Sequence, residues 1–174
     1  MHACATAATL AAMDKQQLVA QLRAQLEASA RAALAQRDAV VAEARDGATP
    51  DEKREDARAA HQRATFGGAQ QRRAKEAIEA ADQLSSFKPG ARAERIILGS
   101  IVEIEDDDSG EGRTFFLAPV GAGVTLTGPG GDGHLSVVTP ASPIGRAVIG
   151  CREGDGVDVT VEGEARAWTI TYVG

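Results

Sequence analysis

Two long alanine-rich segments, about residues 14–45 and 51–83, most constrain what this chain can fold into. Alanine has the highest intrinsic helix propensity, so both segments are predicted to be helical. Only the short break at residues 46–50, Asp-Gly-Ala-Thr-Pro, separates them. We therefore expect an antiparallel coiled-coil hairpin, with helices on the order of 50 Å long at ~1.5 Å per residue.

The predicted contact surface between these helices is narrow. Leu18, Leu22 and Leu26 recur every fourth residue, which places them on one helix face, and alanines make up much of the rest of that stripe. Side chains this small contribute little to each contact. The pair Gly67-Gly68 lies inside the second segment, where glycine costs ~1 kcal/mol per residue relative to alanine. A local kink or a close crossing of the helices is expected there.

After the turn-rich linker Phe87–Gly90, short β-like runs replace the helical pattern. The predicted strands cover residues 96–104, 114–117, 124–126, 135–138, 156–161 and 167–173. We expect a small α+β domain with a twisted, mostly antiparallel sheet, and Phe115, Phe116 and Trp168 in its core. The predicted organisation is an extension at residues 1–12, a helical hairpin at 13–88 and this domain at 91–174.

One short helix is predicted between the strands, at Ser142–Gly150. Ser142 is a favoured N-cap, Pro143 suits the first helical position, and Gly150 suits the terminator. We expect this helix to pack on the sheet through its three large apolar residues, which are Ile144, Val148 and Ile149.

Charge divides between the two halves. The net charge is +1 over residues 1–90 and −7 over residues 91–174. An acidic domain is poorly suited to binding duplex phosphates, so any nucleic-acid contact is expected from the helical half or through a protein partner. The acidic run Asp106-Asp107-Asp108 is predicted to be a solvated strand end rather than a metal site.

A second acidic group opens the second helical segment. Thr49, Pro50 and Glu52 fit an N-cap, a first helical position and a capping-box acid. Four carboxylates follow the break closely: Asp51, Glu52, Glu55 and Asp56. The helix dipole alone favours acids in a first turn by ~0.3–1 kcal/mol each, so this pattern does not require a metal.

The stretch Thr139–Gly150, TPASPIGRAVIG, followed by Glu153-Gly154-Asp155 and a final strand pair, resembles the C-terminal domain of the Gre transcription elongation factors, GreA/GreB. That family has a Ser-Pro-(Ile/Leu)-(Gly/Ala)-(Arg/Lys)-Ala-(Leu/Ile)-(Ile/Leu)-Gly motif and a later Gly-Asp turn. Here the motif follows a predicted helical hairpin with an acidic tip, which is the other half of the family's architecture. The resemblance extends over nearly all of the chain from Met13 onward.

The resemblance implies an FKBP-like C-terminal domain without an isomerase site, docked at the rim of the RNA polymerase secondary channel. Residues Ser142, Pro143, Ile144, Gly145 and Arg146 are the polymerase-binding candidates. The hairpin would pass down the channel toward the nascent RNA 3′ end. The protein would then have no cofactor of its own and would not be an enzyme by itself, since it would share Mg²⁺ with the polymerase and stimulate RNA hydrolysis there.

Family members present an Asp-x-x-Glu pair at the hairpin tip, which helps to hold the second catalytic Mg²⁺. The closest match here is Glu52 with Glu55, and these are the Mg²⁺-binding candidates. Asp51 with Glu55, and Glu52 with Asp56, are alternatives at a spacing of four. Two departures are present: Glu52 stands where the family has Asp, and Ala59 where a tyrosine is common.

Positive charge follows the acids along the second segment. By resemblance to the family's basic face, the RNA-binding candidates are Arg54, Arg58 and Arg63. For Arg54 and Arg58, balancing the charge of the neighbouring acids explains their presence equally well. Arg72, Arg73 and Lys75 extend the positive face, and a solvated helix exterior explains Arg72 and Lys75 nearly as well.

We expect a cytoplasmic protein, and a monomer because the two helices of the predicted hairpin pair with each other. Cys4 and Cys151 give no disulfide framework and are expected to be reduced. No run of ~18 apolar residues is present, so we expect no membrane association through a spanning helix. Met1–Ala12 lacks the basic leading region of a secretory signal, so no such signal is expected. Met13 is an alternative first residue of the protein.

Three functions are compatible with these patterns. The first is a polymerase secondary-channel factor that promotes cleavage of backtracked transcripts. The second is a non-cleaving regulator or inhibitor of RNA polymerase with the same fold. The third is a coiled-coil interaction module that never meets polymerase, and the motif at Ser142–Gly150 disfavours it.

Overall fold

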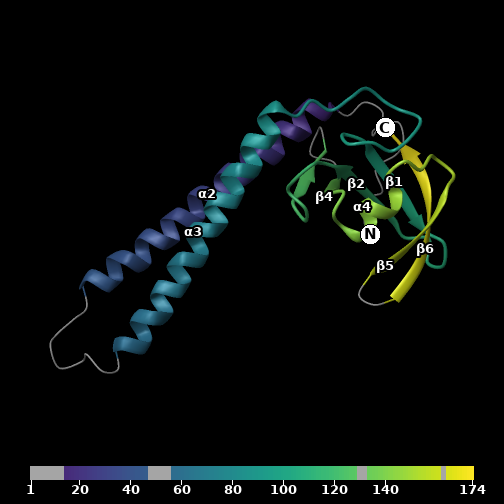
Figure 1. The fold of residues 1–174 in the computed structure, drawn as a ribbon. Helices are drawn as coiled ribbons and strands as arrows, with labels where there is room; N and C mark the ends of the chain where they lie inside the picture. Colours follow the sequence, from purple (N-terminus) through teal and green to yellow (C-terminus); the bar gives the residue numbers. More distant parts are fainter. Residues whose placement is uncertain (1–13, 47–55, 129–132, 162–163) are drawn as a thin grey trace. The chain divides into compact units, whose positions relative to one another are not determined.

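The computed structural model describes residues 14–46, 56–128, 133–161 and 164–174. Its residues divide into two compact units. The globular unit contains the described residues up to Leu22 and those from Gln83 to Gly174, and the hairpin unit contains Arg23–Asp82. Helices α2 (Lys15–Asp46) and α3 (Asp56–Ser86) both contribute to each unit (Figure 1).

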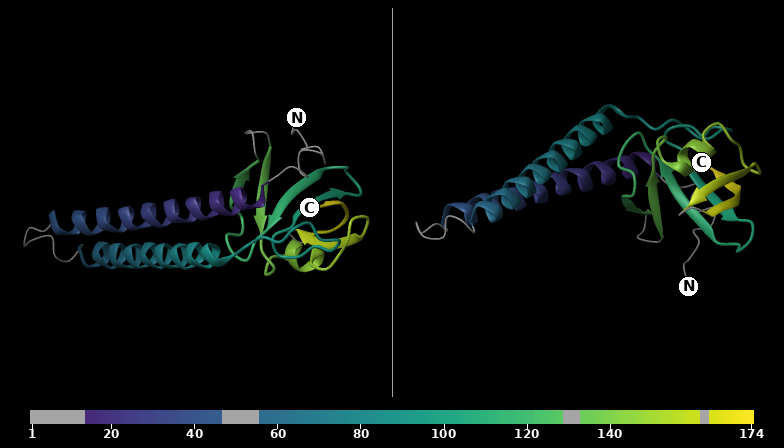
Figure 2. Two further views of the ribbon diagram at one scale, coloured as in Figure 1. Left: turned by 90° about the horizontal axis from the view of Figure 1, so that it is seen from above. Right: turned by 60° about the horizontal axis from the view of Figure 1, so that its bottom comes forward.

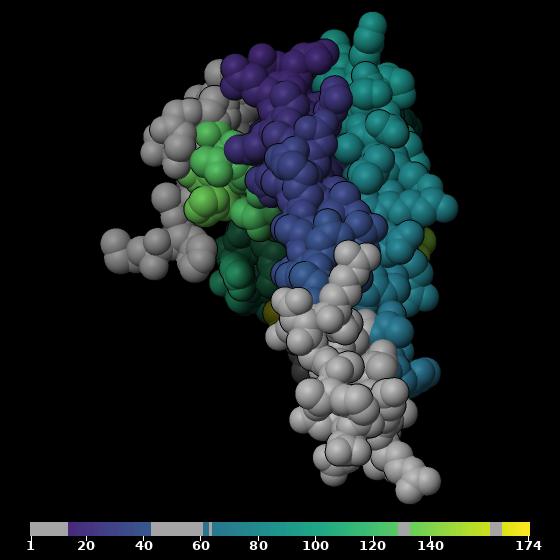
Figure 3. Space-filling model, turned by 90° about the vertical axis from the view of Figure 1, so that its left-hand side faces the viewer, coloured from purple at the N-terminus to yellow at the C-terminus, as the bar shows by residue number. Residues whose placement is uncertain are grey.

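Within the hairpin unit, α2 and α3 lie side by side and antiparallel, as predicted (Figures 1 and 2). Between Arg23 and Asp82, the buried apolar residues that the structure describes are all alanines: Ala30, Ala33, Ala74, Ala77 and Ala81. We call these five residues the alanine seam. Gln70 is buried at the same surface, and Figure 3 shows the two helices in contact. The narrow, small-residue interface expected from the sequence is confirmed.

Beyond the alanine seam, the described part of the hairpin unit contains no further buried residue over 34–42 or 64–69. Val41 and Phe66 are 43% and 47% exposed. A side-chain carbon built at Gly67 or Gly68 would meet no neighbouring atom within 4 Å. The expected close helix crossing at this glycine pair is therefore wrong, because no partner backbone approaches there.

The globular unit is built on a six-stranded sheet in the order β3-β4-β2-β1-β6-β5. The strands are β1 (Ile101–Asp106), β2 (Gly112–Leu117), β3 (Thr125–Thr127), β4 (His134–Val138), β5 (Gly156–Val161) and β6 (Glu164–Val173). All neighbours pair antiparallel except β2 and β4, which are parallel. The predicted α+β class with one short helix is confirmed.

The short helix α4 (Pro143–Val148) covers one face of this sheet (Figure 1). Val148 is fully buried, and Ile144 packs against the same core. The core on this face consists of Ile96, Val102, Ile104, Phe115, Leu117, Val148, Val159, Trp168, Ile170 and Val173. Phe115 and Trp168 are core residues as predicted, and Phe116 is buried on the opposite face. The prediction for Ile149 is wrong: it caps α4 with extended backbone and is 44% exposed.

The predicted strand at residues 96–104 begins five residues later, at Ile101. Ile96 is fully buried, but its backbone exchanges two hydrogen bonds with residues 150 and 151 instead of joining β1. The chain then turns at Gly99, whose φ of +91° is accessible mainly to glycine. Ile97 and Leu98 are consequently exposed.

Asp106 organises the turn between β1 and β2, so the prediction of a solvated strand end is wrong for this residue. Its side chain is buried, and Oδ1 accepts hydrogen bonds from the Ser109 amide at 2.8 Å, the Ser109 hydroxyl at 3.0 Å and the Asp108 amide at 3.1 Å. The Ser109 amide is the main reason that the pKa of Asp106 lies below its ordinary value of 3.8, and desolvation opposes it. Arg166 lies 3.9 Å away and also favours the charged form.

The first two turns of α2 belong to the globular unit. Leu18 and Leu22 are buried, and burial of each leucine contributes about 1.5–3 kcal/mol. Gly121 lies against Leu22, and a side-chain carbon there would come within 2.8 Å of Leu22 Cδ1. Gln21 Oε1 accepts a hydrogen bond of 2.9 Å from the Thr127 amide of β3.

The glycine pair in α3 gives a stability prediction. Gly67→Ala and Gly68→Ala are each expected to raise the free energy of unfolding by up to about 1 kcal/mol, because alanine favours helix and meets no neighbour. Gly145→Ala in α4 is the matched control, since its new carbon would collide with the Thr139 carbonyl. That variant is expected to lose about 1–3 kcal/mol. Chemical denaturation measures all three, and destabilisation by the α3 substitutions would contradict the structure.

The Asp106 turn gives a pH prediction. A carboxyl group whose pKa is lowered by folding stabilises the protein above its unfolded pKa, and this stabilisation is lost as pH falls through the folded pKa. Asp106→Asn is therefore expected to lower the free energy of unfolding at neutral pH. The difference from wild type should shrink once the pH falls below 3.8. Urea denaturation at a series of pH values measures it, and a difference that is constant down to acid pH would contradict the assignment.

Candidate functional site

The predicted tip carboxylates Asp51, Glu52 and Glu55 lie outside the described residues, as do Arg54 and the predicted helix start at Thr49 and Pro50. Helix α3 as described begins at Asp56, the fourth acid of the group. The side chains of three further candidates, Asp56, Arg58 and Arg63, are not described. The Mg²⁺-binding and RNA-binding assignments therefore stay predictions from the sequence.

The described basic residues of α3 lie on its exterior. Arg72, Arg73 and Lys75 are exposed. Lys75 Nζ lies 3.7 Å from Glu79 Oε1, one helical turn away. Such an exposed pair contributes little to stability, so it leaves Lys75 able to exchange partners.

The candidate polymerase-binding motif forms the start of α4, and several of its residues have clear structural roles. Ser142 Oγ accepts a hydrogen bond from the Gly145 amide at 3.0 Å and donates one of 2.8 Å to the Thr139 carbonyl. Pro143 occupies the first turn as predicted. Gly145 is buried against the Thr139 carbonyl, where no larger residue fits.

Other residues of this motif face outward. Pro143 and Arg146 are exposed, and Arg146 Nη1 donates a hydrogen bond of 2.6 Å to the Ala141 carbonyl. Ile149 is a large apolar side chain on the same short segment and is 44% exposed. Ser142 and Gly145 therefore hold the backbone of this motif in place, and its exposed side chains form a surface that a partner can contact.

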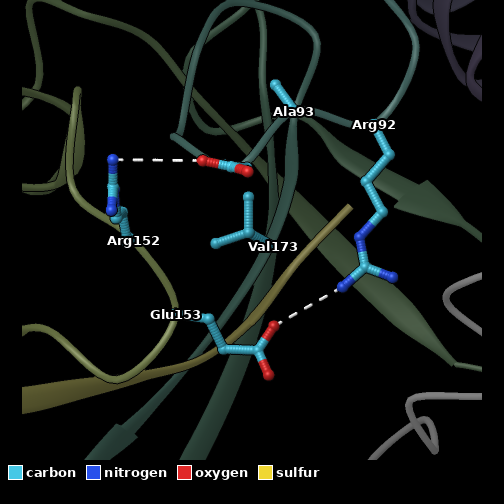
Figure 4. A pocket seen from close by; sticks show the side chains of 6 residues that line it. Arg92, Ala93, Arg152, Glu153 and Val173 are labelled. Carbon is cyan, nitrogen blue, oxygen red and sulfur yellow. Dashed lines mark ion pairs between the residues drawn. The ribbon is translucent and has the colours of Figure 1, made fainter.

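A hollow of about 580 Å³ opens beside this segment, where the linker before Ile96 meets the turn after α4 (Figure 4). Two ion pairs line it, each between one residue of the linker and one of the turn. Arg92 Nη2 lies 3.5 Å from Glu153 Oε2, and Arg152 Nη2 lies 3.9 Å from Glu94 Oε2. Val173 and Ala93 supply its apolar surface.

The ion pairs of the hollow tie the linker to the turn. The Arg92 guanidinium also lies 5.2 Å from the centre of the Tyr172 ring. Arg95 Nη1 donates a hydrogen bond of 2.7 Å to the Gly150 carbonyl. Both ion pairs are exposed, so each contributes at most about 1 kcal/mol and is weakened by salt.

Sequence reasoning missed this hollow. The only available signal was the charge alternation on each side, Arg92 with Glu94 and Arg152 with Glu153. Nothing local indicates that the two segments meet, because their contact depends on the backbone bridge between Ile96 and Cys151. Cys151 itself is a free, partly buried thiol.

No group of three or more His, Cys, Asp or Glu side chains among the described residues is arranged to hold a metal ion. Among the same residues, no helix is long and apolar enough to span a membrane.

Most of the globular unit is similar to known transcription elongation factors. The family model for the C-terminal domain of the transcription elongation factors GreA and GreB matches residues 91–174. GreA of Desulfovibrio desulfuricans is 35% identical over 69 residues, which are 39% of this chain and 37% of that protein. GreA of Polaromonas naphthalenivorans is 34% identical over 89 residues, 51% of this chain and 49% of that protein.

Among solved structures, Gfh1 of Thermus aquaticus aligns over 87% of this chain and 90% of its own, with 25% identity and a TM-score of 0.39. The chain spans about half or less of the length of the two curated relatives that it matches. The family match covers the whole sheet, α4 and the hollow. Residues 91–174 are thus similar in sequence to the C-terminal domain of the GreA/GreB transcription elongation factors.

Proposed function

We propose that this protein is a transcription elongation factor that binds RNA polymerase and promotes cleavage of backtracked transcripts. One combination carries the proposal. A GreA/GreB C-terminal domain at residues 91–174 accompanies a two-helix hairpin whose connecting segment contains four carboxylates. A polymerase factor of this kind acts in the bacterial cytoplasm.

The chemistry proposed for the hairpin is donation of carboxylates to a catalytic centre owned by the polymerase. Mg²⁺ takes one or two carboxylates and leaves the rest of its coordination to water and phosphate, so a partner protein can complete such a site. We assign this role to Glu52 and Glu55, with Asp51 and Asp56 as the alternatives at neighbouring positions. The protein would then have no resident metal and no activity without polymerase.

The outer surface of α4 is the proposed contact with polymerase. Pro143, Arg146 and Ile149 are exposed on one short segment, which offers apolar area and a guanidinium together. This mixture is typical of the centre of protein interfaces, where arginine and large apolar residues are enriched. Ser142 and Gly145 would support this surface from within.

The basic residues of α3 are proposed to track the nascent RNA near its 3′ end. Arg54, Arg58 and Arg63 follow the acids closely in sequence, and the exposed residues Arg72 and Arg73 extend positive charge along the helix. Phosphate binding by such residues depends on charge and weakens with salt. The globular unit, with its net negative charge, is unsuited to this contact.

A second candidate function is that of a non-cleaving regulator that occupies the same polymerase channel. Two sequence departures favour it: Glu52 replaces the family's aspartate at the tip, and Ala59 replaces a common tyrosine. The longer glutamate side chain changes where a carboxylate could reach.

The tip assignment predicts a loss of cleavage without a loss of binding. With Glu52→Gln/Glu55→Gln, stimulation of RNA cleavage in stalled, backtracked polymerase complexes should fall by at least about tenfold, because removal of a charge-stabilising group commonly costs that much or more. Gel analysis of end-labelled transcripts in Mg²⁺ measures this. Glu76→Gln/Glu79→Gln, further along α3, is the control for charge alone. If the wild-type protein binds polymerase but yields no shortened RNA, the cleavage function is wrong and the protein is a non-cleaving regulator.

The α4 assignment predicts weaker polymerase binding from a surface change. Arg146→Glu should raise the Kd for core RNA polymerase by about tenfold or more, since it reverses a charge at the proposed interface. Asp158→Lys, an exposed charge reversal on β5, is the matched control. Fluorescence anisotropy measures both. An unchanged Kd for Arg146→Glu, with the fold intact, would place the interface elsewhere.

A further inference from the structure

We propose that Gln21 is a positioning residue, which fixes α2 on the edge of the sheet and so determines where the carboxylates of the hairpin are delivered. The expected effect of Gln21 on transcript cleavage rests on the proposed function. Its structural part depends only on contacts inside the globular unit, to which both Gln21 and its partner Thr127 belong.

The hydrogen bond joins two segments that are 106 residues apart in sequence. Gln21 Oε1 accepts from the Thr127 amide at 2.9 Å, which is good geometry for an N–H···O bond. Strand β3 lies at the edge of the sheet and pairs only with β4. The Thr127 amide therefore depends on Gln21, rather than on a further strand, for its partner.

One other polar contact is made at the first residue of α2, where Lys15 Nζ donates a hydrogen bond of 3.1 Å to the Gly90 carbonyl. The buried side chains nearest Gln21 in sequence are apolar. Leu18 and Leu22 are 2% and 0% exposed, and Leu22 lies so close to Gly121 that a side-chain carbon there would come within 2.8 Å of Leu22 Cδ1. Apolar burial stabilises the contact but is non-directional, so it permits a helix to roll or slide by small amounts. A hydrogen bond is directional and fixes the orientation that burial leaves free.

Small changes at this point have large effects further along the helix. Helix α2 is continuous from Lys15 to Asp46. At ~1.5 Å per residue, its far end lies about 37 Å beyond Gln21, so a tilt of 10° at the root would move that end by about 6 Å. Displacement of a reacting group by even ~1 Å can cost ~100-fold in rate.

The test separates the hydrogen bond from the side-chain volume. Gln21→Met keeps the length of the side chain but removes the acceptor, whereas Gln21→Glu keeps an oxygen that can accept from Thr127. Gln17→Met is the matched control, because Gln17 lies one turn earlier on α2 and is exposed. Thermal unfolding of all variants checks that each is folded.

Two readouts are needed. The first is the width of the distance distribution between spin labels at positions 36 and 158, in a full-length protein with both native cysteines changed to serine. The second is transcript cleavage at saturating protein, compared with the Kd for polymerase. Gln21→Met should broaden the distribution and lower cleavage by at least about tenfold with an unchanged Kd. Gln21→Glu should restore both readouts, and Gln17→Met should match wild type.

Wild-type behaviour in Gln21→Met, or equal loss in Gln21→Glu, would overturn the assignment. If the wild-type protein itself stimulates no cleavage, the proposed cleavage function fails. The spin-label distances still decide the positioning role in that case: broadening in Gln21→Met that Gln21→Glu reverses supports it, and an unchanged width overturns it.

Discussion

The burial of Leu18 and Leu22 in the globular unit is the contact on which the helical half of this protein most depends. Alanine favours helix but buries little area, and isolated helices obtain most of their stability in proteins from packing. The alanine seam supplies such packing only as far as Ala33 and Ala74 within the described residues, with Gln70 beside it. Burial of the large side chains Leu18 and Leu22 therefore stabilises the start of α2 more than the alanines further along the helix can.

The elements governed by local rules could be predicted from the sequence. The limits of α2 follow from its alanine content and from the break at residues 46–50, and the predicted bounds of β5 match the structure. Ser142 and Pro143 correctly marked the start of α4, because an N-cap and a first-turn proline act within a few residues.

Features that depend on distant partners could not be predicted. Ile96 leaves the expected strand because residues 150 and 151 take its backbone hydrogen bonds. Asp106 is buried because Ser109 folds back over it, which a run of three aspartates does not indicate. The hollow between Arg92 and Arg152 requires two segments about sixty residues apart in sequence to meet, and the bond from Gln21 to Thr127 spans an even longer separation.

The motif at Ser142–Gly150, which resembles that of GreA and GreB, contains two kinds of residue, and the structure separates them. Ser142 and Gly145 are required by the backbone around Thr139, so their presence is explained by folding alone. Pro143, Arg146 and Ile149 face outward, so they remain available to a partner. The tip carboxylates have no such structural explanation beyond the helix dipole, and their assignment depends on the sequence pattern.

A cryo-electron microscopy structure of this protein bound to a backtracked RNA polymerase complex would test the proposed function. We expect α4 to contact the polymerase surface, and carboxylates from residues 51–56 to lie beside the catalytic Mg²⁺ ions and the RNA 3′ end. A complex in which that segment lies far from the catalytic centre, with the globular unit bound at another surface, would contradict it.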